Sequence, residues 1–265
     1  MRLAIIGCGN MGSAVVRGLL DAGWTTRGEI IATHPDPDRA NEISQRLGIE
    51  ATTNNAKAAK GAEIILLGIK PQLIKRALQD LRGQLKPNQL VISIAAGIST
   101  RFIETYLPDS PIVRSMPNLP VTIAAGATAI SAGSNASANH LASAEEIFRA
   151  VGIVEVIPEY LMDAVTGLSG TGPMYVFHFL EAMADAGVRM GLPRDVATRL
   201  STQTIRGAAK LAELSELHPA ALKDQVTSPG GTAIAALHVL RREAFSAIVM
   251  DAVAEATKRS AELGD

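Results

Sequence analysis

The chain has 265 residues, with 25 lysines and arginines against 26 aspartates and glutamates. A chain of this length can bury a large core and forms one or two domains. The near-neutral charge and an aromatic content of 3% exclude the basic, base-stacking surface of a nucleic-acid-binding protein. Cys8 is the only cysteine in the sequence, so no intrachain disulfide can form, and we expect a reducing, cytoplasmic location.

Residues 115–144 carry no charged side chain, but their Pro, Asn, Ser and Gly content is too polar for a membrane span. Glycines also interrupt the first apolar run, which argues against a secretory leader. No cluster of His, Cys, Asp and Glu in the sequence has metal-ligand spacing. We therefore expect no membrane, no nucleic acid and no metal as partners.

The first turn of the chain carries a Gly-x-Gly-x-x-Gly motif. Leu3–Ile6 predicts a strand buried on both faces, and Ser13–Ala22 predicts an amphipathic helix. Between them, Gly7 permits a tight turn, Gly9 lets the backbone approach a pyrophosphate, and Gly12 lets the helix pack on the strand. The N–H groups at the helix start favour an anion. This order predicts a dinucleotide site; the alternative is an ordinary tight turn.

Further apolar runs alternate with helical patterns along the first 158 residues. This alternation predicts a doubly wound parallel sheet of the Rossmann type, in the α/β class. The strands are predicted at Glu29–Thr33, Glu63–Leu67, Leu90–Ile94, Pro111–Arg114, Ala127–Ile130 and Gly152–Val156. The helices are predicted at Asp38–Leu47, Pro71–Leu81, Ser99–Tyr106 and Ala138–Ala150.

The end of the second predicted strand bears on the choice of dinucleotide. Thr33 and His34 stand where NAD-specific folds place an acidic residue that binds the ribose 2′-OH, and Arg39 follows soon after. These side chains tolerate a 2′-phosphate, which favours NADP(H), while Asp36 keeps NAD(H) open. Lys70 follows another strand and could meet a cofactor phosphate or ribose; a solvated lysine is the alternative.

From Tyr160 onward the pattern is helical, with almost no strand signal. Residues 172–190 are apolar on nearly every side until Glu181, so that helix must be buried in the fold or in a partner subunit. We predict a nucleotide-binding domain over residues 1–158 and an all-helical dimerisation domain over 159–265. The helices of the second domain are predicted at Gly172–Met190, Arg194–Leu214, Pro219–Asp224, Gly231–Leu240 and Ala244–Leu263.

A second glycine motif lies within this helical half. Gly230 and Gly231 precede a helical run, so they expose backbone N–H groups at its start, where a carboxylate can bind. Ser228 and Thr232 add hydroxyl groups on either side. The alternative is a helix N-cap with ordinary turn glycines.

Together these motifs resemble those of the pyrroline-5-carboxylate reductases, which catalyse the last step of proline biosynthesis. The resemblance runs nearly end to end, and the blocks Asp163–Pro173 and Val226–Gly231 are specific to that family. It implies a Rossmann domain followed by an all-α dimerisation domain of the 6-phosphogluconate-dehydrogenase C-terminal type, in homodimers that can form decamers. It also implies that NADPH, or NADH as a weaker donor, reduces 1-pyrroline-5-carboxylate to L-proline by hydride transfer to the C=N carbon.

The resemblance further implies which residues form the site, by match to the family motifs. Cofactor contacts are expected at Gly7, Cys8, Gly9, Asn10, Met11, Gly12, Thr33, His34, Asn55, Ile69, Lys70, Pro71, Ala95, Ala96, Gly97 and Asn118. Substrate contacts are expected at Glu216, Val226, Thr227, Ser228, Gly230, Gly231 and Thr232, with Glu216 and Thr232 as the catalytic residues.

The chain departs from the family pattern at two positions. Leu119 replaces the threonine of Met-x-Asn-Thr-Pro, and Ala233 stands where the family has a threonine whose hydroxyl is expected to bind the ring nitrogen. Thr232 is adjacent, but neighbouring helical residues point about 100° apart. Two alternatives therefore stay open: a related imine or β-hydroxyacid reductase, and a nucleotide-binding relative without turnover.

Overall fold

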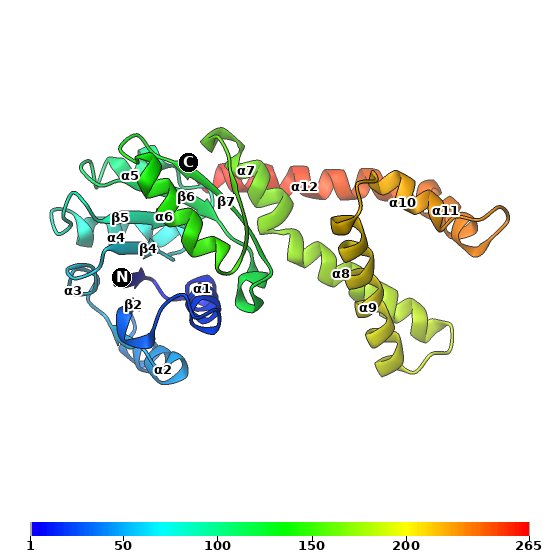
Figure 1. Cartoon of the computed structure of the whole chain (residues 1–265), viewed down its shortest axis with the longest axis horizontal. Helices are drawn as coiled ribbons and strands as arrows, with labels where there is room; N and C mark the ends of the chain where they lie inside the picture. The colour runs from blue at the N-terminus through cyan, green and yellow to red at the C-terminus, as the bar shows by residue number, and fades with distance from the viewer. Residues whose placement is uncertain (1, 265) are drawn as a thin grey trace. The chain divides into compact units, whose positions relative to one another are not determined.

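Eight strands, most of them buried apolar runs, form one sheet in the computed structural model, which describes residues 2–264 (Figure 1). The strand order is β3-β2-β1-β4-β5-β6-β7-β8, and the first six strands in this order are mutually parallel. The order reverses between β1 and β4, the position at which ligands bind in open α/β sheets. The strands are β1 (Leu3–Ile6), β2 (Ile30–Thr33), β3 (Glu50–Thr52), β4 (Ile64–Leu67), β5 (Leu90–Ser93), β6 (Ile112–Met116), β7 (Gly126–Ala132) and β8 (Gly152–Val156).

One direction within the sheet differs from the prediction. β7 runs antiparallel to β6, and β8 is parallel to β7. The segment between Met116 and Gly126 contains a 3-10 turn, Leu119–Ile123, and no crossover helix. A parallel connection needs about a dozen residues or more. The short connection therefore turns the chain back on itself, so the predicted parallel sheet holds for the first six strands and β7 departs from it at this edge.

Helices cover both faces of the sheet and enclose two separate cores. Leu3 and Ile5 of β1 belong to the core under α1, α2 and α6, while Ala4 and Ile6 belong to the core under α3, α4 and α5. Successive strand residues point to opposite faces, which explains why the central strands are apolar at every position. The helices are α1 (Asn10–Asp21), α2 (Pro37–Leu47), α3 (Asn55–Ala59), α4 (Ile74–Leu81), α5 (Thr100–Glu104), α6 (Ala138–Arg149) and α7 (Met162–Val165).

The chain divides into two compact units, Met1–Pro173 with Ala254–Asp265, and Met174–Val253. The sheet and its helices belong to the first unit. The last helix, α12 (Phe245–Glu262), begins in the second unit and ends in the first. The boundary between residues 158 and 159 stays a prediction, since these contact-based units divide the chain at other residues.

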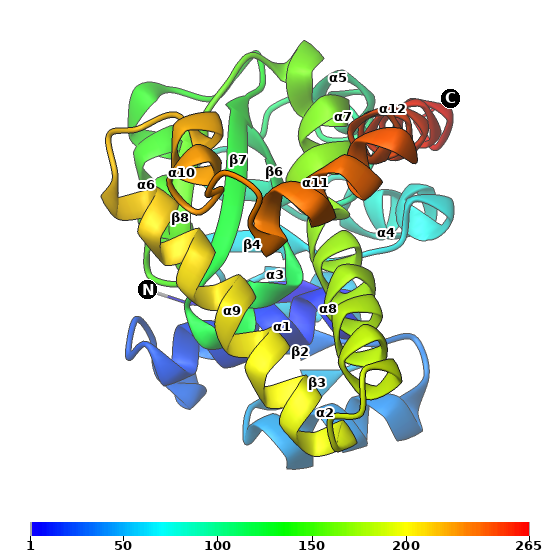
Figure 2. The ribbon, with the colours of Figure 1, turned by 90° about the vertical axis from the view of Figure 1, so that its right-hand side faces the viewer.

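The second unit consists of helices with very little buried surface. The Phe179 and Phe245 rings lie 6.1 Å apart, and the Tyr175 hydroxyl donates to the Ala252 carbonyl at 3.4 Å, so α8 packs along α12. The remaining helices of this unit are largely exposed, and Figure 2 shows α10 and α11 joined by their loop. No helix within residues 2–264 has the length and hydropathy needed to cross a membrane. The helices are α8 (Gly172–Arg189), α9 (Arg194–Leu214), α10 (Pro219–Gln225) and α11 (Thr232–Arg242).

Candidate functional site

The glycine turn after β1 has an open side. Gly7 has φ +83°, and a Cβ there would lie 2.5 Å from Ile69 Cγ1, so the protein itself requires this glycine. At Gly9 a Cβ would meet nothing within 4 Å among the described residues. Helix α1 begins at Asn10 without a side-chain cap from Gly9. Its first N–H groups are therefore available to an anion, and the turn fits a pyrophosphate.

Thr33 and Asn55 hold this turn from beneath. The Thr33 hydroxyl accepts the Gly7 N–H at 3.0 Å and donates to Asn55 Oδ1 at 2.7 Å. The Cys8 N–H donates to the Thr33 carbonyl at 2.8 Å. Asn55 in turn donates to Asp80 at 3.0 Å. Thr33 thus contacts the turn directly and Asn55 supports it through Thr33, whose buried hydroxyl has both a donor and an acceptor partner.

Cys8 is buried in the turn and packs as a small side chain. Its Sγ lies 3.4 Å from Ser13 Oγ, which also accepts from Arg46 at 3.0 Å. Burial raises the pKa of the Cys8 thiol, an effect partly opposed by Ser13 and Arg46. A raised pKa keeps the thiol protonated at neutral pH, so it is a poor nucleophile. Cys8 therefore contributes to the packing of the turn and does not act as a thiolate nucleophile.

Two side chains follow the end of β2: the half-buried imidazole of His34, and the carboxylate of Asp36, which already accepts hydrogen bonds from the backbone. His34 Nδ1 accepts the Asp36 N–H at 3.2 Å, which leaves its other ring nitrogen for a ligand. Asp36 Oδ1 accepts the N–H groups of Asp38 at 2.9 Å and Arg39 at 3.3 Å and caps α2. The exposed Arg39 pairs with Glu42 at 2.6 Å. The acidic residue that kept NAD(H) open is thus engaged in the helix cap.

The other predicted cofactor residues follow β4, β5 and β6 at the same edge of the sheet. Lys70 is exposed and precedes a 3-10 turn, and the Ala95–Gly97 segment begins two residues after Ser93, the last residue of β5. Asn118 is buried; it donates to the Ser169 carbonyl at 3.1 Å and accepts the Ala127 N–H at 2.9 Å. No local pattern predicts a role for Ser169, because its partner Asn118 lies 51 residues away.

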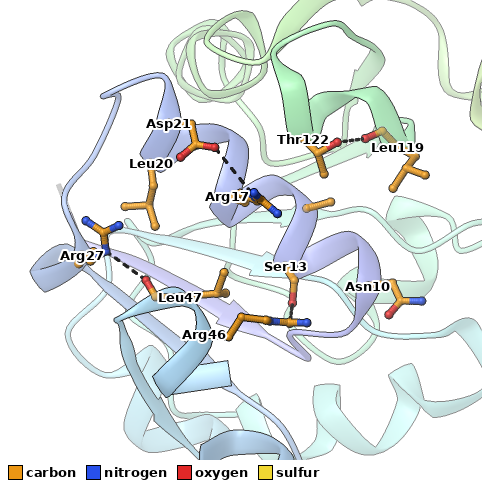
Figure 3. A pocket seen from close by; sticks show the side chains of 11 residues that line it. Asn10, Ser13, Arg17, Leu20, Asp21, Arg27, Arg46, Leu47, Leu119 and Thr122 are labelled. Atoms are coloured by element: carbon orange, nitrogen blue, oxygen red, sulfur yellow. Dashed lines mark hydrogen bonds and ion pairs between the residues drawn. The ribbon is translucent and has the colours of Figure 1, made fainter. Parts of the chain in front are cut away.

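A groove of about 570 Å³ runs along the outer side of α1 (Figure 3). Three guanidinium groups, from Arg17, Arg27 and Arg46, line it. Asn10 lies on its wall and so joins it to the glycine turn, and the unusual Leu119 lies there as well. No sequence motif predicted this groove, since its arginines come from separate elements.

The predicted substrate loop lies in the second unit. Gly230 has φ +68°, and the Gly231 N–H donates to the Ser228 carbonyl at 3.1 Å. A Cβ at Gly231 would meet Ser228 Oγ, the end of a side chain that can rotate away, so it is the positive φ of Gly230 that favours glycine in this turn. Within the described chain, α11 starts at Thr232 with no side-chain cap at Gly231. Its first N–H groups can therefore bind a carboxylate.

Glu216 and this loop lie on opposite sides of α10 in the sequence. Glu216 precedes α10, whereas Val226 follows it, so a helix of seven residues separates them. Such a helix is roughly 10 Å long. The Thr227 hydroxyl donates to the Lys223 carbonyl at 2.8 Å, and no hydrogen bond or ion pair in residues 2–264 joins Glu216 to the loop.

Residues 2–264 hold no group of three or more His, Cys, Asp and Glu that could bind a metal.

The reversal of strand order beside a glycine turn and an uncapped helix is typical of a Rossmann-type dinucleotide-binding domain, the class of protein to which dinucleotide-dependent oxidoreductases belong. Residues 2–97 match the family model described as NADP oxidoreductase, coenzyme F420-dependent. Residues 159–263 match the model described as pyrroline-5-carboxylate reductase dimerisation.

Full-length relatives identify the family. The pyrroline-5-carboxylate reductases of Synechocystis and Methanosarcina acetivorans are 44% and 42% identical, covering 100% and 99% of this chain and 98% of each relative. The crystal structure of Plasmodium falciparum pyrroline carboxylate reductase with NADP bound is 30% identical, with a TM-score of 0.92 over 100% of this chain and 98% of that one. The chain belongs to the pyrroline-5-carboxylate reductase family. It is an NAD(P)-dependent oxidoreductase of proline biosynthesis. This family assignment decides against the two alternatives left open by the sequence, a related imine or β-hydroxyacid reductase and a nucleotide-binding relative without turnover.

Proposed function

We propose that NADPH is the preferred hydride donor and NADH a weaker one. The turn Gly7–Gly12 would hold the pyrophosphate, and His34 with Arg39 would face the 2′-phosphate. Asp36 opposes a phosphate less than a free carboxylate does, because its side chain caps α2. The relative from Plasmodium falciparum, which has NADP bound, supports the same choice.

Residues of the second unit would bind the substrate and support its reduction. When bound, the reduced nicotinamide supplies the hydride that the C=N carbon of 1-pyrroline-5-carboxylate accepts. The N–H groups at the start of α11, with the Ser228 and Thr232 hydroxyls, would bind the substrate carboxylate. Glu216 would hold the ring N–H and favour the cationic iminium, which is the better hydride acceptor. Proline leaves with the proton on its nitrogen.

The observation that carries this proposal is the uncapped start of α11 behind Gly230 and Gly231, in a block specific to the family. The test measures oxidation of NADPH with and without pyrroline-5-carboxylate, with NADH in parallel. We expect substrate-dependent oxidation with a higher kcat/KM for NADPH. A higher kcat/KM for NADH would overturn the cofactor preference, and absence of oxidation with either would overturn the substrate assignment.

Replacing Glu216 by glutamine should lower kcat/KM for pyrroline-5-carboxylate about tenfold and change its pH profile, because a charge-assisted hydrogen bond to the ring N–H is lost. The measurement is kcat/KM against pH at saturating NADPH. Glu213→Gln is the control, since the exposed Glu213 pairs with Lys210 at 2.9 Å on the preceding helix. An unchanged profile in Glu216→Gln would remove Glu216 from the mechanism.

We also propose a homodimer that can assemble further into a decamer, in the cytoplasm. Large apolar side chains of the second unit are exposed in the single chain, among them Phe177 at 57%, Leu211 at 57% and Met250 at 70%. Side chains of this kind are normally buried, so we infer that a second copy of the chain buries them in a dimer interface. The family model matched over residues 159–263, described as a dimerisation domain, supports this. Sedimentation velocity of the purified chain distinguishes dimer from decamer.

A further inference from the structure

The segment that follows β5 is held from behind by the end of α12. Gly97 has φ +76°, and a Cβ there would lie 2.5 Å from the Ser260 carbonyl oxygen and 2.9 Å from the Gly264 nitrogen. A Cβ at Gly264 would overlap the Gly97 carbonyl oxygen. The two backbones are thus in direct contact at a pair of glycines 167 positions apart in sequence, and a side chain at either position would separate them.

A buried hydrogen bond fixes the end of α12 in this position. Ser260 is 2% exposed, and its hydroxyl donates to Asp163 Oδ1 at 2.7 Å. The same carboxylate oxygen accepts from Arg114 Nη2 at 3.2 Å. Because a buried hydrogen bond to a charged group is costly to break, α12 is held firmly at this point.

Arg114, which bonds the same Asp163 carboxylate, is also connected to residues on either side of the Ala95–Gly97 segment. It is 5% exposed and lies opposite Ser93, the last residue of β5. Its Nη1 lies 3.6 Å from Glu159 Oε1. Glu159 accepts the N–H and the hydroxyl of Thr100, each at 2.7 Å, at the start of α5. The buried guanidinium therefore stands beside Ser93, two residues before the Ala95–Gly97 segment, and through Glu159 it holds Thr100, three residues after it.

We propose that the Arg114–Glu159–Asp163 cluster and residues 260–264 act as a clamp that holds the Ala95–Gly97 segment in its cofactor-binding conformation. Ser260 and Gly264 are then positioning residues for the cofactor, although they lie far from it in sequence. This inference rests on the proposed NADPH site, to which the match with the family motifs adds a contact at Ala95–Gly97. A contact displaced by about 1 Å can cost two orders of magnitude in rate, so firm support of the segment matters.

The test compares Gly264→Val and Ser260→Ala with the control Gly28→Val, where a Cβ would meet nothing within 4 Å in the described chain. We expect the Kd for NADPH, measured by nicotinamide fluorescence, to rise about tenfold in Gly264→Val and about threefold in Ser260→Ala. The KM for pyrroline-5-carboxylate at saturating NADPH should change less than about twofold, and Tm should fall by less than about 4 °C. Gly28→Val should leave all three values unchanged.

Ala96→Asp separates failure of the clamp from failure of the proposed contact, because it places a carboxylate on the segment itself. If Ala96→Asp weakens NADPH binding and Gly264→Val does not, the clamp is wrong and the contact stands. If neither variant changes the Kd, the contact at Ala95–Gly97 is wrong, and the clamp with it. A fall in Tm accompanied by equal losses in both substrates' affinities would show a general structural role and overturn the clamp.

Discussion

Replacing Gly9 by alanine should raise the Kd for NADPH about 100-fold and lower the free energy of unfolding by less than about 1 kcal/mol. Gly9 has φ −79° and ψ −153°, which any residue adopts, and a Cβ there meets nothing within 4 Å in the chain as described. The fold therefore does not require this glycine. A pyrophosphate approaching the N–H groups of α1 does, because the Cβ would occupy the space it needs. Titration with NADPH, followed by fluorescence, measures the effect.

Gly7 and Gly28 provide the matched comparison for this prediction. Gly7→Ala puts a Cβ 2.5 Å from Ile69 Cγ1 at φ +83°, so it should lower stability as well as binding. Gly28→Ala fills open space and should change neither. An NADPH Kd for Gly9→Ala within twofold of the parent chain would mean that the turn does not carry the pyrophosphate.

The central sheet could be predicted because strands buried on both faces appear in the sequence as uninterrupted apolar runs. β1, β4 and β5 are buried on both faces, so each is apolar without alternation. Strand direction has no such signature, so β7 was predicted as a strand but its antiparallel direction was not. β3 and α3 have three and five residues and partly exposed polar positions, too short for any periodicity to register.

The site could be predicted only as far as its motifs are local. The glycine turn is read within six residues, and its support by Thr33 and Asn55 follows once the family is recognised. The specific bonds do not: Thr33 bonds Asn55 across 22 residues, and Asp163 bonds Ser260 across 97. Arg114 shows the limit most clearly. It ends an apolar run, and its burial between two carboxylates depends on packing that no local pattern encodes.

Replacing Thr232 by valine should lower kcat/KM for pyrroline-5-carboxylate about 100-fold and leave the Kd for NADPH unchanged. The chain lacks the family threonine at Ala233, and Thr232 is the adjacent hydroxyl, at the first position of α11. A hydrogen bond from that hydroxyl to the charged substrate accounts for a loss of this size. Thr232→Ser keeps the hydroxyl in nearly the same volume and is the control; it should retain most activity.

Adding Ala233→Thr tests the same site from the other side. In the parent chain it should raise kcat or lower KM, because it returns a hydroxyl to the family position. In the Thr232→Val background it should recover about tenfold in kcat/KM, since one well-placed hydrogen bond supplies that much. Steady-state kinetics of the four combinations form a double-mutant cycle that measures how far the two positions substitute for each other. A loss of activity in Ala233→Thr alone would show instead that the half-buried Ala233 is packed into a site built around it.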